Sequence, residues 1–106
     1  MPTDETPLLH RLVGGDAFAA DQVIARAPST SSASLLVAAA VLSGDEDLLH
    51  RAAGIAATPR ERQLVVLAAA HLHGEIDLFD VLVRDHLVEH PDHLLAAWIA
   101  GRPRNH

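Results

Sequence analysis

The sequence predicts an all-α fold of about seven helices. Glycine and proline interrupt the chain at intervals of about 10 to 17 residues, which is the spacing of helices joined by tight turns. Between these breaks the apolar residues recur with the period of a helix, and aromatic side chains, which favour strands, make up only 3% of the residues. The helices are expected over residues 6–13, 16–27, 32–43, 46–57, 59–73, 76–90 and 92–100.

Short polar sequences set the limits of the first four helices. Gly14–Asp16 is typical of a turn between the first and second helices, and Pro28 ends the second. The hydroxyl groups of Ser29–Ser32 are candidate N-caps for the third helix. The acidic residues 45–47 begin the fourth helix, where negative charge stabilises the N-terminus.

The caps of the last three helices are more specific. Thr58 and Glu61 stand in the positions of a capping box, with Pro59 at the first helical position between them. Pro91 ends the sixth helix and Asp92 is placed to cap the seventh. A left-handed glycine that ends a helix is expected at three places: Gly44, Gly74 and Gly101.

The sequence contains an internal repeat. Residues 37–49 align with residues 67–79 at an offset of 30, with seven identities: Ala38, Ala39, Ala40, Leu42, Gly44, Asp47 and Leu48. A period of this length with two helices in each unit predicts antiparallel helical hairpins stacked on one another. The units are expected at about 6–28, 32–58 and 59–91, followed by a terminal helix over 92–101.

The second copy of the repeat resembles the tetratricopeptide-repeat family. The resemblance is carried by the turn Leu72–Asp77 and by the segment Leu87–Pro91, with Pro91 standing 17 residues after Gly74 as in that family. It covers roughly residues 32–101 and departs from the family in lacking the aromatic residues of the first helix. The resemblance implies a short right-handed α-solenoid that presents a surface to other proteins; a more divergent α-solenoid family is the alternative.

Composition restricts the class of protein. The length of 106 residues predicts a single domain, with flexible tails at 1–5 and 102–106. A net charge of −6, with no lysine, argues against binding to nucleic acid or to an anionic membrane. The longest apolar run, Leu35–Leu42, is too short to span a bilayer, and the first residues do not have the pattern of a secretory signal. We therefore expect a cytoplasmic protein, and the arginine- and alanine-rich composition suggests a bacterial source.

One motif raises the question of metal binding. His86, Glu89 and His90 fit the pattern H-x-x-E-H, in which two histidines bind zinc and a glutamate activates water. Only 16 residues follow His90, however, which leaves little chain for the third ligand that catalytic zinc requires. We expect His86 to lie half-buried in the apolar stripe of its helix. No catalytic, cofactor-binding or metal-binding residue is predicted.

The sequence therefore favours a non-catalytic helical-repeat scaffold that binds a protein partner or a second copy of itself. In the last helix the larger apolar residues should pack on the preceding hairpin and leave a face of small residues as the interaction surface: Ala96, Ala97 and Ala100. Two alternatives remain. The chain is either a fragment of a larger helical enzyme or ligand-binding protein, with His86, Glu89 and His90 as its site, or one end of a longer solenoid.

Overall fold

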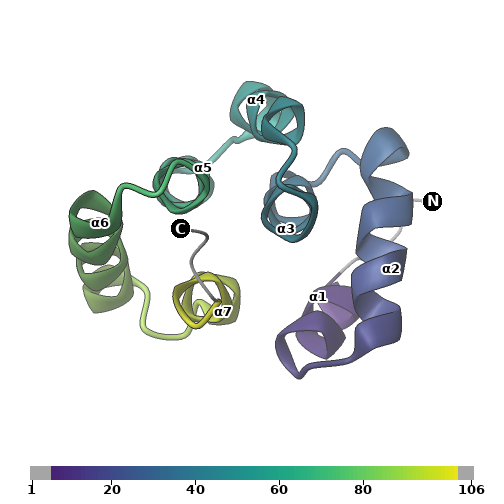
Figure 1. Ribbon diagram of the computed structural model, residues 1–106, viewed down its shortest axis with the longest axis horizontal. Helices are drawn as coiled ribbons and strands as arrows, with labels where there is room; N and C mark the ends of the chain where they lie inside the picture. The colour runs from purple at the N-terminus through teal and green to yellow at the C-terminus, as the bar shows by residue number, and fades with distance from the viewer. Residues whose placement is uncertain (1–5, 103–106) are drawn as a thin grey trace.

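Seven α-helices and one short 3-10 helix form the part of the chain that the computed structural model describes, residues 6–102 (Figure 1). Within these residues there is no strand, so the all-α prediction is confirmed. The elements are α1 (Thr6–Val13), α2 (Ala17–Arg26), η1 (Ala27–Ser29), α3 (Ala33–Ser43), α4 (Glu46–Ile55), α5 (Pro59–Leu72), α6 (Ile76–Glu89) and α7 (Leu94–Ala100).

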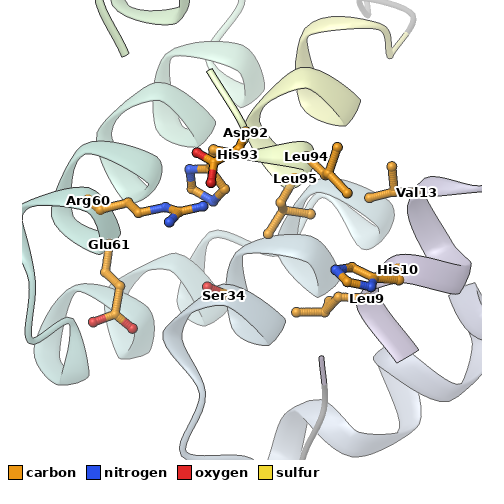
Figure 2. A pocket seen from close by; sticks show the side chains of 10 residues that line it. All are labelled: Leu9, His10, Val13, Ser34, Arg60, Glu61, Asp92, His93, Leu94 and Leu95. Atoms are coloured by element: carbon orange, nitrogen blue, oxygen red, sulfur yellow. The ribbon is translucent and has the colours of Figure 1, made fainter. Parts of the chain in front are cut away.

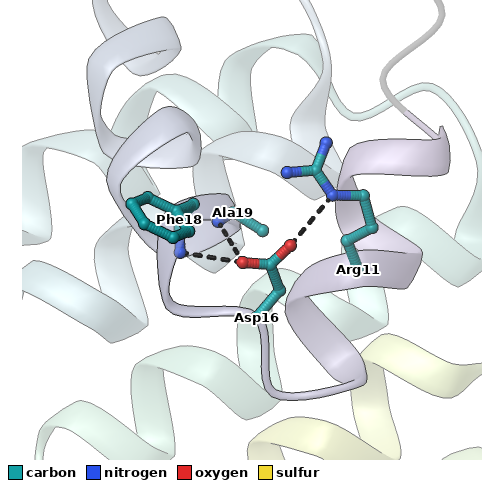
Figure 3. Close-up of polar contacts among 4 residues, drawn as sticks. All are labelled: Arg11, Asp16, Phe18 and Ala19. Atoms are coloured by element: carbon teal, nitrogen blue, oxygen red, sulfur yellow. Dashed lines mark hydrogen bonds and ion pairs between the residues drawn. The ribbon is translucent and has the colours of Figure 1, made fainter.

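Side-chain caps begin several of these helices. Thr58 and Glu61 form the predicted capping box: the Thr58 hydroxyl accepts a hydrogen bond from the Glu61 N–H at 3.1 Å, and the Glu61 carboxylate accepts one from the Thr58 N–H at 3.2 Å. At the start of α2, the Asp16 carboxylate accepts bonds from the Phe18 N–H and from Arg11 (Figure 3). The Arg11 guanidinium and these backbone donors lower the pKa of Asp16.

Two of the three predicted left-handed glycines end a helix as expected. Gly44 and Gly74 have φ of 75° and 71°, and both precede the second helix of a repeated pair. After α5 the Glu75 N–H donates to the Ala70 carbonyl at 3.0 Å, the bond of a Schellman motif. The prediction for Gly101 is wrong. Its φ is −86°, because its N–H continues the right-handed bonding of α7 to Ala97 and Trp98.

The core is centred on α3. Every residue from Leu35 to Val41 is buried, as expected for a helix that is apolar on all sides. Helices α2, α4, α5 and α7 all contact it. The alanines at 38–40 allow these neighbours to approach closely, so the Ala-rich segment of the repeat forms the centre of the molecule.

The last two helices do not follow the prediction in every respect. Pro91 lies one residue beyond the C-cap of α6, as predicted, but α7 starts at Leu94 rather than at 92. Asp92 does not cap α7, because His93 takes the N-cap position and its ring is buried against α6. Helix α7 thus begins two residues later than predicted, and the histidine that precedes it is buried.

Helix α7 is not the open end of a row of helices. It contacts α6 and α5, and it also contacts α3 and α1, so that the last helix lies beside the first (Figure 1). In a linear stack each repeat contacts only its neighbours. The contact between α1 and α7 departs from that pattern and creates the space in which the candidate site lies.

Candidate functional site

A pair of buried histidines joins α6 to the start of α7. His86 lies on the buried face of α6 and is only 2% exposed, while His93 is 7% exposed. Nε2 of His86 and Nδ1 of His93 are 2.6 Å apart, and Nδ1 of His86 is 2.9 Å from Oε1 of Gln63 on α5. Three helices thus meet at one chain of hydrogen bonds.

The donors and acceptors of this chain follow from the chemistry of each group. The side-chain oxygen of Gln63 only accepts, so Nδ1 of His86 carries the proton and donates to it. In the neutral ring Nε2 of His86 is then an acceptor, and His93 donates to it from Nδ1. The remaining nitrogen of His93, Nε2, has a free lone pair and forms no hydrogen bond within residues 6–102.

The surroundings of the pair favour the neutral rings. Burial lowers the pKa of His93 from its usual 6.5 to about 4, and the positive charge of Arg60 adds to this effect. Burial also lowers the pKa of His86, with further contributions from His90 and Arg60. The nearest acids, Asp92 for His93 and Glu89 for His86, act in the opposite direction and are both exposed.

Two pockets flank this pair of histidines. The first has a volume of about 340 Å³ and lies where α1, α5 and the start of α7 meet; His93 and Arg60 are part of its lining (Figure 2). The second has a volume of about 390 Å³ and lies between α5 and α6, with His86 and Gln63 in its lining. Each of the two pockets is therefore lined by one member of the hydrogen-bonded histidine pair.

The H-x-x-E-H motif does not assemble a metal site. Both ring nitrogens of His86 are engaged in hydrogen bonds, Glu89 is exposed, and His90 lies just beyond the end of α6. The His86 and His90 rings are in contact, with centroids 4.9 Å apart. Throughout residues 6–102, no group of three or more potential ligands is placed to hold a metal ion. His86 is buried, more deeply than the half-buried position that the sequence predicted.

The alanines predicted as an interaction surface lie in different environments. Ala97 and Ala100 are exposed, whereas Ala96 is completely buried. The prediction for Ala96 is wrong because it assumed that α7 packs on one side only, and the other helices that contact α7 cover more of its surface. The exposed part of α7 is therefore narrower than expected.

Sequence reasoning missed three residues of the site: Gln63, His93 and Arg60. One signal in the sequence pointed to such residues. His86 is predicted to lie within an apolar stripe, and a buried histidine requires hydrogen-bond partners. Polar residues on the neighbouring helices were the candidates for these partners. Which of these residues bond to His86 depends on how α5, α6 and α7 pack together. The spacing of residues within one helix does not determine this packing.

A different apolar surface lies on the outside of α6. Leu78, Val81 and Val88 are exposed by 47%, 49% and 77%, and helical spacing places them along one face. The opposite face of α6 is buried, as Phe79 and His86 show. This exposed row, Leu78, Val81 and Val88, is called the outer face of α6 below.

Comparison with known proteins gives no match: no family model, no curated protein and no solved structure corresponds to this chain. None of the helices within residues 6–102 is long and apolar enough to cross a membrane. The function must therefore be inferred from the surfaces and pockets of the chain itself.

Proposed function

We propose that this chain is a non-catalytic helical scaffold that binds a protein partner through the outer face of α6. The observation that carries the proposal is the exposure of Leu78, Val81 and Val88 along one side of a helix whose other side is buried. Exposed apolar side chains grouped in this way are typical of a surface that another protein covers.

The charges around this row indicate the kind of partner. Asp77, Asp85 and Glu89 are exposed on α6 together with one arginine, Arg84, so acids predominate there. Asp85 and Glu89 also line the pocket between α5 and α6. The net charge of the whole chain is also negative, at −6. We infer that the partner is a basic amphipathic helix, with apolar side chains that cover Val81 and Val88 and with lysines or arginines that face the carboxylates.

Membership of the tetratricopeptide-like class belongs to the same proposal. It is supported by the repeat at an offset of 30 and by the left-handed conformation of both Gly44 and Gly74 at equivalent turns. Helices consecutive in the sequence contact one another, and α3 also contacts α5. In this proposal the scaffold is a short α-solenoid whose last helix folds back onto the first.

The test uses a synthetic 18-residue peptide with leucines at helical spacing and lysines on the opposite face. Binding is measured by the fluorescence anisotropy of a label on the peptide. We expect micromolar binding to the wild-type chain and about a hundredfold weaker binding to the double variant Val81→Ser, Val88→Ser, since each buried valine contributes about 1.5 kcal/mol and about 1.4 kcal/mol corresponds to a factor of ten.

A matched control is available on α2, where Phe18 is 76% exposed, close to the 77% of Val88. The variant Phe18→Ser should bind the peptide as the wild type does. A peptide with glutamates in place of lysines should not bind. Equal binding of both peptides, equal loss in the Phe18 variant, or no binding of the lysine peptide would refute the proposed surface.

Self-association through Ala97 and Ala100 stays a prediction, as does the cytoplasmic location. Light scattering on the wild type shows whether a second copy of the chain or a different protein covers the outer face of α6. A dimer that the Val81→Ser, Val88→Ser variant dissociates would show that a second copy, rather than a basic helix of another protein, covers the outer face of α6.

A further inference from the structure

The pocket between α1, α5 and the start of α7 has the size and polarity of a site for a small molecule. Its volume of about 340 Å³ falls within the usual range for such sites, about 300–1,000 Å³. It exists because α7 folds back against α1, and it lies apart from the outer face of α6. Its two ends differ in chemistry, and this difference defines the ligand.

Among the residues that the structure describes, the polar end of the pocket carries one fixed positive charge, and that charge has no partner there. The guanidinium of Arg60 is part of a half-buried residue, and within residues 6–102 it forms neither a hydrogen bond nor an ion pair. Figure 2 shows its side chain extending towards the ring of His93. A partly desolvated guanidinium without a counter-charge is unfavourable, and carboxylates are its best-matched partners.

His93 supplies a second polar group at the same end. Its ring is fixed in orientation by the 2.6 Å hydrogen bond from Nδ1 to His86, and His93 also lines the pocket. Nε2 remains without a partner among the described residues. When Nε2 takes up a proton, the ring donates from both nitrogens and keeps its bond to His86. His93 can therefore gain a charge without disturbing α6.

The two acids of the pocket leave room for an anion. The Glu61 carboxylate accepts hydrogen bonds from the Ala57 and Thr58 N–H groups at 3.0 and 3.2 Å, and Figure 2 shows it directed away from His93. Asp92 lies at the polar end, but it is exposed and forms no ion pair with either Arg60 or His93. Because Arg60 is the one permanent cation among the described residues that line the pocket, the site favours a monoanion over a dianion.

The other end of the pocket is mainly apolar. Leu9 and Val13 of α1 face Leu94 and Leu95 of α7 across it, with His10 beside them (Figure 2). Leu94 is half exposed although it lines the pocket, so an apolar group placed there would remove its surface from water.

We propose that this pocket binds a small carboxylic acid with an alkyl tail, the carboxylate against Arg60 and His93 and the tail against Leu9, Val13 and Leu94. The negative charge of the bound carboxylate favours protonation of His93. It also offsets the repulsion between the protonated ring and the positive charge of Arg60. Ligand binding and proton uptake at His93 are therefore linked, and affinity rises as the pH falls. The charged groups that face His93 are Arg60 from α5, His86 and His90 from α6, and Asp92 beside it.

The test titrates the full chain with sodium octanoate by calorimetry at pH 7.5 and pH 6. We expect binding at pH 7.5, tighter binding at pH 6, and at least a tenfold loss of affinity in Arg60→Gln. The matched control is Arg62→Gln, which removes an arginine two residues away that lines the other pocket. That variant should bind octanoate as the wild type does.

Two further probes test the two ends of the ligand separately. Octan-1-ol and acetate should each bind at least tenfold more weakly than octanoate. Octanol binding as tight as that of octanoate would refute the role of Arg60, and equally tight acetate binding would refute the apolar end. If Arg60→Gln fails to fold, the proposal is still tested on the wild-type chain, by the pH dependence of octanoate binding and by the affinities for octanol and acetate. Affinity that is unchanged or weaker at pH 6 would overturn the proposal.

Discussion

His93 donates a hydrogen bond from Nδ1 to Nε2 of His86 over 2.6 Å, and this bond ties the residue before α7 to the buried face of α6. The two residues are seven apart in the chain, and their ring centroids are 4.8 Å apart. Gln63 extends the contact to α5 through a second bond of 2.9 Å. The position of α7, and with it the pocket against α1, depends on this hydrogen bond between two buried rings.

The first prediction is that the fold loses stability in mild acid. His93 has a pKa of about 4 when folded and 6.5 when unfolded, so between these values the unfolded chain binds a proton that the folded chain does not. The free energy of unfolding should therefore fall as the pH drops from 6.5 to 4, by about 3 kcal/mol from this residue. Urea denaturation at pH 7.5, 5.5 and 4 measures the loss.

The variant His93→Gln isolates the contribution of this ring. It should be less stable than the wild type at pH 7.5, but its stability should decline less between pH 6.5 and 4. Parallel pH profiles for the variant and the wild type would show that another group causes the loss.

A second prediction concerns His86. Replacing it with alanine removes a buried ring and leaves the side chains of Gln63 and His93 without their partner, which should lower the free energy of unfolding by about 3 kcal/mol. Thermal unfolding followed by circular dichroism measures the effect. His50 on α4 is exposed, so His50→Ala should change stability by less than about 0.5 kcal/mol. Similar melting temperatures for both variants would contradict the proposed importance of the His86 bonds.

The elements that the sequence predicted well are those determined by local chemistry. The capping box of Thr58 and Glu61 and the left-handed turns at Gly44 and Gly74 depend on a few neighbouring residues, and all occur as expected. The burial of the Ala-rich helix α3 likewise agrees with the apolar surface that its own residues form on every side. These features could be predicted because each has its cause within about one turn of helix.

The candidate site could not be predicted in the same way. The sequence placed Asp92 at the cap of the last helix, a sound local choice, but burying His93 against His86 fixes the start of α7 two residues later. Likewise, Arg60 stands within the predicted capping sequence between Thr58 and Glu61, and its place in a pocket depends on the return of α7 to α1. Contacts between distant segments determine both features, and helical periodicity carries no information about them.

A third prediction uses two glycines that differ in backbone conformation. Gly74 has φ of 71°, where a side chain costs about 1–2 kcal/mol, so Gly74→Ala should destabilise the fold by that amount. Gly54 lies within α4, and a Cβ there would meet no atom within 4 Å, so Gly54→Ala should stabilise the helix by up to about 1 kcal/mol. Urea denaturation should therefore give shifts of opposite sign. Shifts of the same sign would show that one of the two conformations is misassigned.

The last prediction compares Ala96 and Ala97, neighbours on α7 with opposite environments. Ala96 is completely buried and Ala97 is exposed. An arginine at position 96 would place a charge in the core, so Ala96→Arg should unfold the chain or lower its melting temperature by more than about 10 °C. Ala97→Arg should leave the melting temperature nearly unchanged.

The fluorescence of Trp98 reports on the folding of both variants, because it is the only tryptophan in the chain. Its ring is partly covered in the folded state, with Arg102 5.0 Å away. Its emission should shift to the red in Ala96→Arg and stay unchanged in Ala97→Arg. Equal stability of the two variants would mean that α7 does not pack against α1 and α3.

Light scattering on the same samples tests self-association. A wild-type dimer that Ala97→Arg converts to a monomer would assign the dimer contact to the exposed side of α7. A monomer in both cases would exclude that contact.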